Sequence, residues 1–494
     1  MSDNPYDAVI VGSGPNGLAA GITLAREGLR VLILEARDTP GGGMRTAELT
    51  LPGFLHDVCS AVHPMAMLSP FLSTLPLAKF GLEWAHPDIL LAHPLEGGRA
   101  AALFQGLDQT AAALPKGDGR CWQALFGPLV PGARGLFGDL LGPLPLRPKH
   151  PFHLVRFGLS AMRSATGLAS AKFKSEEAQA LFSGNAAHSF LPLENSFTAA
   201  VGMALGLAGH AGGWPVARGG SGGITKALTR YFEALGGEIR CGVEVRDVRE
   251  LPGAAAVLFD IGPRATARIA EAWLPQRYRR RLECYRYGPG IFKMDYALSG
   301  PVPWTNPLCR QAGTVHVGGT MAEIAHAERE TWQGKESAKP FILVGQQSLC
   351  DSTRAPAGQH TLWAYAHVPS GSRRDFSDII TSQIERFAPG FRELILATHA
   401  MNPGMIETYN NNNIGGDIIG GVMDLTQMFT RPVARWNPYT TPHPKLFHCS
   451  SSTPPGAGVH GMCGYHAART VLRNVFGMRP DPAAFPEGAD GNQG

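Results

Sequence analysis

The chain has 494 residues, a formal net charge of +4 at pH 7, and a composition of 44% hydrophobic and 17% charged residues. This length exceeds what one hydrophobic core usually supports, so the sequence predicts a globular protein with two lobes. The charge is mild, and no basic stripe carries interleaved aromatic residues, which argues against a nucleic-acid partner.

The first 35 residues predict a dinucleotide-binding unit. The apolar run Ala8–Val11 predicts a strand, which leads into the loop Gly12–Gly17 (GSGPNG) and then a helix expected over residues 18–27. A second apolar run, residues 30–34, ends on Glu35. Because the strand, the helix and the acidic residue all stand at the expected spacing, this loop differs from a chance match in a glycine-rich chain.

The residues of this loop have separate physical roles. Gly12 permits the tight turn out of the strand, Gly14 lets the backbone approach a pyrophosphate, and Gly17 lets the helix pack closely on the strand. The start of the helix then presents unpaired N–H groups to the phosphates. Glu35 is placed to accept hydrogen bonds from ribose hydroxyls, and its charge would repel a 2′-phosphate, which disfavours NADP.

Further along the chain, glycine-rich segments alternate with predicted elements. Pro40-Gly41-Gly42-Gly43 follows Glu35 after a short connection, either as part of a cofactor site or as a plain glycine turn. The glycine-rich residues 218–223 come directly before a helix that is expected over residues 224–235, and a strand is expected over residues 243–248.

The C-terminal part predicts a second strand, loop and helix. Residues 445–449 predict the strand, and the glycine-rich segment 453–464 predicts the loop and the start of the helix. The four asparagines Asn410 to Asn413 predict a solvated turn, because asparagine tolerates unusual backbone angles.

Residues 125–168 are rich in Leu, Phe, Gly and Pro, with basic residues and few acids. They are open to two interpretations, a helical lid over a substrate cavity or a surface that lies on a bilayer and admits a lipophilic substrate. No apolar run reaches the roughly 18 residues that a membrane span requires, and no signal peptide is visible. The eight cysteines are scattered without a CxxC pair, which argues against a dithiol centre and a metal site. We therefore expect a cytoplasmic protein, with peripheral membrane contact as an open alternative.

These segments resemble FAD-dependent oxidoreductases of the phytoene desaturase-like branch of the amine oxidase superfamily. The resemblance rests on the N-terminal unit, the Gly-Gly element after Glu35, residues 413–417 with Gln427, Arg431 and Pro432, and the C-terminal strand, loop and helix. Amine oxidases usually carry arginine after the Gly-Gly pair, whereas this chain has Gly43, which favours the desaturase-like branch.

The resemblance implies an α/β fold, with a Rossmann-like FAD-binding domain interleaved with an α+β substrate domain containing a mixed or antiparallel sheet and helices. The FAD-binding domain is expected at residues 1–80, 214–290 and 411–494, and the substrate or lid domain at residues 81–213 and 291–410. FAD is expected to bind non-covalently at Gly12, Gly14, Pro15, Asn16, Gly17, Glu35, Ala36, Gly41, Gly42, Gly43, Val245, Gly458, Val459 and Met462.

In a flavoenzyme the reactive atom belongs to the cofactor, so the protein positions the substrate and tunes the ring. The candidates near the ring are His56, Asp57, His63 and His460, each with a structural role as the alternative, and no catalytic acid or base is assigned. A second set of residues either lines an apolar pocket or belongs to the core: Tyr285, Tyr287, Tyr296, Trp304 and Trp363.

The expected reaction is hydride transfer between a small apolar substrate, such as a polyene, isoprenoid or alicyclic compound, and FAD, with desaturation as the first expectation. The alternatives are a saturase or double-bond isomerase, an amine oxidase, and a non-catalytic protein that binds prenylated partners. No second GxGxxG in a strand–helix context is present, so oxygen, a quinone or another acceptor would take the electrons.

Overall fold

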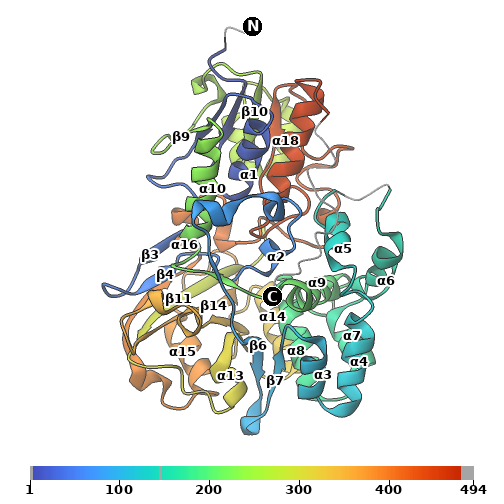
Figure 1. Cartoon of the computed structure of the whole chain (residues 1–494), viewed down its shortest axis with the longest axis vertical. Helices are drawn as coiled ribbons and strands as arrows, with labels where there is room; N and C mark the ends of the chain where they lie inside the picture. The colour runs from blue at the N-terminus through green and yellow to red at the C-terminus, as the bar shows by residue number, and fades with distance from the viewer. Residues whose placement is uncertain (1–3, 144–146, 480–494) are drawn as a thin grey trace.

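The computed structural model describes residues 4–143 and 147–479 and contains two main β-sheets (Figure 1). The first is a five-stranded sheet in the order β16-β10-β1-β2-β9, in which every neighbouring pair is parallel. Its strands are β1 (Ala8–Val11), β2 (Val31–Leu34), β9 (Glu238–Arg240), β10 (Ala256–Phe259) and β16 (Leu446–His448). The central strands β1, β2 and β10 are entirely buried, as expected for a parallel sheet with both faces covered.

Helix α1 (Pro15–Ala25) packs against this sheet between α10 (Gly222–Ala234) and α18 (Met462–Asn474) (Figure 1). Proline at the first turn of α1 suits a position whose N–H group has no partner within the helix. The α1–α18 crossing is very close, because a Cβ atom built on Gly464 would lie 1.8 Å from the carbonyl oxygen of Asn16.

The second sheet has seven strands in the order β15-β11-β14-β13-β12-β6-β7. It is mixed, because β12 pairs with β6 in parallel while the other neighbours are antiparallel. Its strands are β6 (Ile89–Pro94), β7 (Ala100–Leu103), β11 (Gly290–Leu298), β12 (Ala312–Val317), β13 (Ile342–Gly345), β14 (His360–Val368) and β15 (Ile395–Met401). Two short pairs, β3 (Thr46–Glu48) with β4 (Leu55–Asp57) and β5 (Trp84–Ala85) with β8 (Val216–Ala217), complete the strands of the described part.

Most of the helices between β7 and β8 form a layer beside the second sheet (Figure 1). They are α3 (Leu107–Ala113), α4 (Lys116–Phe126), α5 (Ala133–Leu140), α6 (Pro151–Ala161), α7 (Ala165–Lys172), α8 (Glu176–Ala187) and α9 (Thr198–Gly212). The other helices are α2 (Pro64–Met67), α11 (Pro263–Ile269), α12 (Gln276–Glu283), α13 (Pro307–Gln311), α14 (Met321–Trp332), α15 (Ser377–Glu385), α16 (Pro403–Tyr409) and α17 (Leu425–Met428). Among the described residues, none of these helices combines the length and the apolar composition that crossing a bilayer requires.

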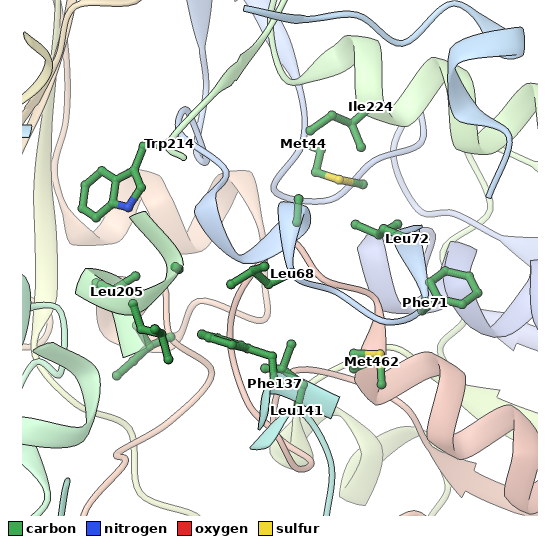
Figure 2. Packing of buried hydrophobic residues seen from close by; sticks show 14 of the residues in the cluster. Met44, Leu68, Phe71, Leu72, Phe137, Leu141, Leu205, Trp214, Ile224 and Met462 are labelled. Atoms are coloured by element: carbon green, nitrogen blue, oxygen red, sulfur yellow. The ribbon is translucent and has the colours of Figure 1, made fainter. Parts of the chain in front are cut away.

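One hydrophobic cluster joins the two lobes. Figure 2 shows Met44, Ile224 and Met462 from the first lobe in the same cluster as residues of the helical layer. Those residues include Phe137, Leu141 and Leu205. The lobes therefore share a core and cannot be separated without exposing it to water.

The α/β fold class is confirmed, including the mixed sheet of the second lobe. The predicted strand over residues 243–248 is wrong: β9 ends at Arg240, and residues 243–247 are irregular. The alternating valines of this stretch pointed to a strand, but only Val245 and Val248 are buried there. The exact domain boundaries stay a prediction.

Candidate cofactor and substrate site

A cavity of about 670 Å³ lies between the carboxyl ends of β1, β2 and β10 and the second lobe. This is the edge at which parallel α/β sheets bind ligands. One part of its wall, the nucleotide part, consists of Val11–Asn16, Leu34–Arg37, Val243–Val245 and Asp260–Gly262. Another part, the apolar chamber, is formed by Phe137, Phe157, His188, Phe190, Leu205, Trp214, Ile291, Thr314, Leu343, Trp363 and Tyr365. The C-terminal loop contributes Ser450–Ser452, Pro455 and Ala457–His460 to the same cavity.

The glycine loop leaves no room for side chains. Gly12 has φ of +100°, and a Cβ atom there would lie 2.7 Å from the carbonyl oxygen of Asp260. A Cβ on Gly17 would lie 2.1 Å from the carbonyl oxygen of Gly12, so the first turn of α1 packs directly on the loop. A Cβ on Gly14 would lie 2.6 Å from a carboxylate oxygen of Asp260. The backbone of the loop is thus bare toward the cavity, as approach by a pyrophosphate requires.

The Gly-Gly element packs on this loop. Gly41 donates its N–H to the carbonyl oxygen of Ser13 at 3.1 Å, and a Cβ on Gly42 would lie 2.9 Å from the Cα atom of Gly14. Gly42 and Gly43 line the cavity. The two glycine segments therefore form one cradle, although about 25 residues separate them in the sequence.

Glu35 is held in place by groups of the same wall. Its Oε2 atom accepts hydrogen bonds from the Ser13 hydroxyl at 2.5 Å and the Ser13 N–H at 3.1 Å, and its Oε1 atom accepts one from the Arg37 N–H at 2.9 Å. The guanidinium of Arg45 lies 3.4 Å from Oε1 and also lines the cavity. These contacts fix the carboxylate at the end of β2, where sequence reasoning placed a ribose-binding group.

Sequence reasoning missed Asp260, which stands directly after β10. Its Oδ2 atom accepts the N–H of Gly17 at 2.8 Å, which ties β10 to the start of α1. Complete burial raises the pKa of Asp260 well above its usual range, and the hydrogen bond from Gly17 only partly opposes this shift. The sequence did contain a signal for Asp260, because it is an acidic residue at the end of the apolar run Ala256–Phe259. A strand parallel to β1 ends at the same edge of the sheet as the glycine loop, so a residue in this position is expected near the cofactor site.

Of the predicted cofactor residues, most line the cavity: Gly12, Gly14, Pro15, Asn16, Glu35, Ala36, Gly42, Gly43, Val245, Gly458 and Val459. The other three are not part of the wall: Gly17, Gly41 and Met462. The asparagine run forms the turn that the sequence predicted, since the Asn413 N–H bonds the carbonyl oxygen of Asn410 at 2.8 Å and Asn411 is exposed. Asn410 to Asn413 also line the cavity, which the sequence did not predict. Asn410 accepts the Asn412 N–H through its side-chain oxygen at 3.2 Å, which closes the turn locally. Asn412 accepts the N–H of Gly262 at 2.8 Å through its own side-chain oxygen, so a long-range contact ties this turn to the cavity wall.

The four candidates near the ring separate into two pairs. Asp57 is fully buried in a structural network, accepting from the Ser221 hydroxyl at 2.7 Å and from the Arg354 guanidinium at 2.9 Å. His56 bonds the Thr50 hydroxyl at 2.8 Å. Neither lines the cavity wall formed by described residues.

His63 and His460, in contrast, line the cavity. Burial lowers the pKa of both imidazoles to about 4, so both rings are neutral near pH 7. His460 accepts the Met462 N–H at 3.0 Å through Nδ1 and thereby caps the start of α18. Neither ring nitrogen of His63 has a hydrogen-bond partner among the described residues.

The apolar chamber has an aromatic wall that the sequence did not predict as a group. Phe190 follows α8 and Trp214 follows α9, whereas Trp363 and Tyr365 both lie on β14. The rings of Trp363 and Tyr365 meet edge to face at 5.1 Å. Of the five aromatic residues proposed from the sequence, only Trp363 lies on this wall.

The other four are packed elsewhere. Tyr296 and Trp304 are in the core of the second sheet, and Tyr285 donates its hydroxyl to the carbonyl oxygen of Gly420 at 2.7 Å. Tyr287 contacts the ring of Tyr285. Alternation along β11 explains the position of Tyr296, because Ile291 faces the cavity while residues of the opposite parity face the core.

Comparisons with known proteins agree with this architecture. Residues 10–69 match the NAD(P)-binding Rossmann-like domain. The chain is 26% identical to "Pyridine nucleotide-disulfide oxidoreductase domain-containing protein 2" of Mus musculus, over 96% of this chain and 94% of the mouse protein. A stretch of 38 residues is 60% identical to the hydroxyneurosporene desaturase of Cereibacter sphaeroides, which is 8% of each chain.

Among solved structures, wild-type putrescine oxidase bound to putrescine has a TM-score of 0.62 and 16% identity, covering 96% of this chain and 99% of that chain. This likeness concerns the fold. All eight cysteines lie in the described part of the chain and are free thiols. Together these findings support an oxidoreductase built around a Rossmann-like dinucleotide-binding domain.

Proposed function

We propose that the chain is an FAD-dependent oxidoreductase that transfers a hydride between an apolar, uncharged substrate and a non-covalently bound FAD. The observation that carries this proposal is the continuity of the cavity, in which the glycine cradle and the apolar chamber share one space. A dinucleotide held by the cradle would extend toward the chamber, so the reactive ring and an apolar substrate would meet inside it. When bound, FAD would supply N5 as the hydride acceptor.

The protein's part in FAD binding follows from the wall of the cavity. The bare Gly12–Gly17 backbone and the first turn of α1 suit the pyrophosphate, and Glu35 suits the ribose hydroxyls. Val245 lies in an irregular stretch of backbone at the cavity wall, where its peptide groups would be available to an adenine. Gly458 and Val459 bring the C-terminal loop to the same cavity, where a ribityl chain and ring would lie.

Charge distribution favours an uncharged substrate. Among the described residues of the wall, the acidic side chains are Glu35, Glu244 and Asp260, and all three belong to the nucleotide part. The histidines that reach the rest of the cavity include neutral His63 and His460. The apolar chamber thus has no carboxylate for a substrate cation, while its aromatic and aliphatic side chains suit a polyene, isoprenoid or alicyclic compound.

Desaturation accounts for these features. The substrate would lose a hydride to FAD and a proton to water from neighbouring carbons and gain a double bond. The two electrons would then pass from the reduced cofactor to oxygen, a quinone or another acceptor. The short similarity to hydroxyneurosporene desaturase supports this direction, and saturation or double-bond isomerisation would use the same surroundings.

Amine oxidation is the second candidate. The likeness of fold to putrescine oxidase and the edge-to-face pair Trp363 and Tyr365 favour it, since aromatic faces also suit an amine. The position of the acidic residues counts against it. A non-catalytic protein that binds prenylated partners would use the chamber alone and leave the cradle without a cofactor.

The test is the absorbance spectrum of the purified protein, followed by anaerobic addition of a polyene and isoprenoid extract and, separately, of putrescine. We expect flavin bands that bleach with the apolar extract and persist with putrescine. Bleaching by putrescine alone would favour amine oxidation. A protein without flavin bands, which also takes up no added FAD, would overturn the proposal in favour of the non-catalytic protein.

A matched pair of variants tests the cradle itself. Gly14→Val would place methyl groups against the Asp260 carboxylate and the path of the pyrophosphate, so we expect purified protein without bound FAD. Gly117→Val, on an exposed turn of α4 with open space around its Cβ position, should keep the wild-type FAD content. Equal FAD content in the two variants would remove this loop from the cofactor site.

A further inference from the structure

Helix α6 exposes an apolar face to solvent. The exposed fractions are 88% for Phe152, 63% for Val155, 72% for Leu159 and 59% for Met162. Their spacing of three and four residues puts them on one side of the helix, which lies at the outer edge of the helical layer (Figure 1). An ordered row of large exposed apolar side chains marks an interaction surface, because soluble proteins rarely leave such a row uncovered.

The charged residues of the segment that carries this face have one sign. Between Leu140 and Ser175 the sequence contains no aspartate or glutamate and six lysines and arginines. Arg147, Lys149, Arg156 and Arg163 are exposed, and none of the four forms an ion pair with a described residue. An apolar row beside unpaired cations matches the headgroup and acyl layers of an anionic bilayer.

The opposite side of α6 belongs to the substrate cavity. Phe157 is buried and lines the apolar chamber, so a single helix separates the chamber from the exposed apolar row. The same arrangement occurs at α17, where Met428 lines the cavity while Leu425 and Phe429 are about half exposed.

The two exposed surfaces are linked through Phe197. Its N–H bonds the carbonyl oxygen of Met162 at 3.4 Å, and its ring lies 6.2 Å from that of Phe429. The apolar surface therefore runs from α6 to α17 along the edge of the cavity.

We infer that this surface, formed by Phe152, Val155, Leu159, Met162, Leu425 and Phe429 with its surrounding cations, docks on an anionic phospholipid bilayer and lets an apolar substrate pass from the acyl layer into the chamber. The entry of substrate rests on the proposed function, whereas the docking does not. A second copy of the chain is a poorer occupant, because a two-fold contact through this face would bring its unpaired cations together.

Co-sedimentation of the full-length, FAD-containing protein with vesicles tests the docking. We expect binding to vesicles of phosphatidylcholine and phosphatidylserine in a ratio of about 7:3, weaker binding to phosphatidylcholine alone, and a further loss at high salt. The double variant Phe152→Ser, Leu159→Ser should lower the partition coefficient at least tenfold, because two exposed anchors are lost.

Leu396→Ser is the matched control, since Leu396 is 46% exposed on β15 of the second sheet and should leave the partition coefficient unchanged. Absence of wild-type binding to the anionic vesicles, or an equal loss in the control, would overturn the inference. A wild-type dimer in light scattering that the double variant abolishes would assign the surface to self-association instead. FAD content measured on the same samples separates these outcomes from a failure of the proposed function.

Discussion

Asp260 joins three parts of the cofactor cradle through one carboxyl group. Its carboxyl group accepts the Gly17 N–H and lies 2.6 Å from the position that a Cβ atom on Gly14 would take. The residue itself follows directly after β10. Burial favours its neutral form, which would also lower the repulsion between this group and the pyrophosphate of the proposed cofactor. Neither consequence is visible from the local sequence, since both arise when residues about 240 positions apart meet.

The first prediction concerns the pH dependence that Asp260 imposes on stability. Because its pKa is raised in the folded state, the folded protein holds a proton that the unfolded chain releases above about pH 4, so this group costs stability as the pH rises. Asp260→Asn keeps the acceptor oxygen and removes the titration. Relative to the wild type, the unfolding free energy of the variant in urea should therefore rise between pH 5 and pH 8. A difference that stays constant across this range would contradict a raised pKa.

The second prediction concerns Glu35. Glu35→Ala should weaken FAD binding by about 1–3 kcal/mol, the usual cost of losing a charged hydrogen bond, as measured by titrating apoprotein with FAD. Glu244→Ala is the control, because Glu244 also lines the cavity but is half exposed and pairs with Arg246. Wild-type affinity in Glu35→Ala would show that another group binds the ribose.

At the level of elements, local patterns predicted the parts whose geometry is set by neighbours in sequence. The strand, glycine loop and helix at residues 8–25 and the strand and helix at residues 446–474 were correctly expected. The aromatic wall of the chamber and the contact between Asn412 and Gly262 were not expected, because only tertiary contacts bring those residues together. The strand prediction at residues 243–247 was wrong because the local pattern was present without the tertiary contact. The valines of this stretch alternate as in a strand, but no neighbouring strand of the described chain pairs with them.

The α1–α18 crossing gives a prediction at this scale. Gly464→Ala would place a methyl group 1.8 Å from the Asn16 carbonyl oxygen, so the helices must separate, at a cost of about 1–3 kcal/mol in unfolding free energy. Gly138→Ala in α5, where a Cβ meets nothing within 4 Å, should instead be neutral or stabilising by up to about 1 kcal/mol. Denaturant unfolding of both variants measures this, and equal effects would contradict the close crossing.

At the level of the whole molecule, buried histidines dominate the expected acid response. Burial lowers to about 4 the pKa of seven imidazoles: His56, His63, His93, His210, His448, His460 and His466. Between pH 6.5 and pH 4 the unfolded chain therefore binds more protons than the folded one, and stability falls as the pH falls. The raised pKa values of Asp260 and Asp417 act in the other direction but involve fewer groups.

Urea unfolding followed from pH 7 to pH 4.5 should show a continuous loss of unfolding free energy, beginning near pH 6.5. Potentiometric measurement of proton uptake on unfolding at pH 5.5 provides an independent check. Unfolding free energy that is constant over this range, without proton uptake, would mean that these imidazoles are hydrated in the folded protein.

The strand order of the first sheet also dictates when the protein can become functional during its synthesis. Strands β1 and β2 leave the ribosome early, but β9 and β10 follow some 200 residues later, and β16 with α18 comes some 200 residues after those. A nascent chain thus synthesises α3 to α9 while only β1 and β2 of the first sheet exist, and it completes the second sheet while β16 and α18 are still missing. The cavity that would hold the proposed cofactor is therefore complete only after the loop at residues 450–460 has been synthesised, because this loop forms part of its wall.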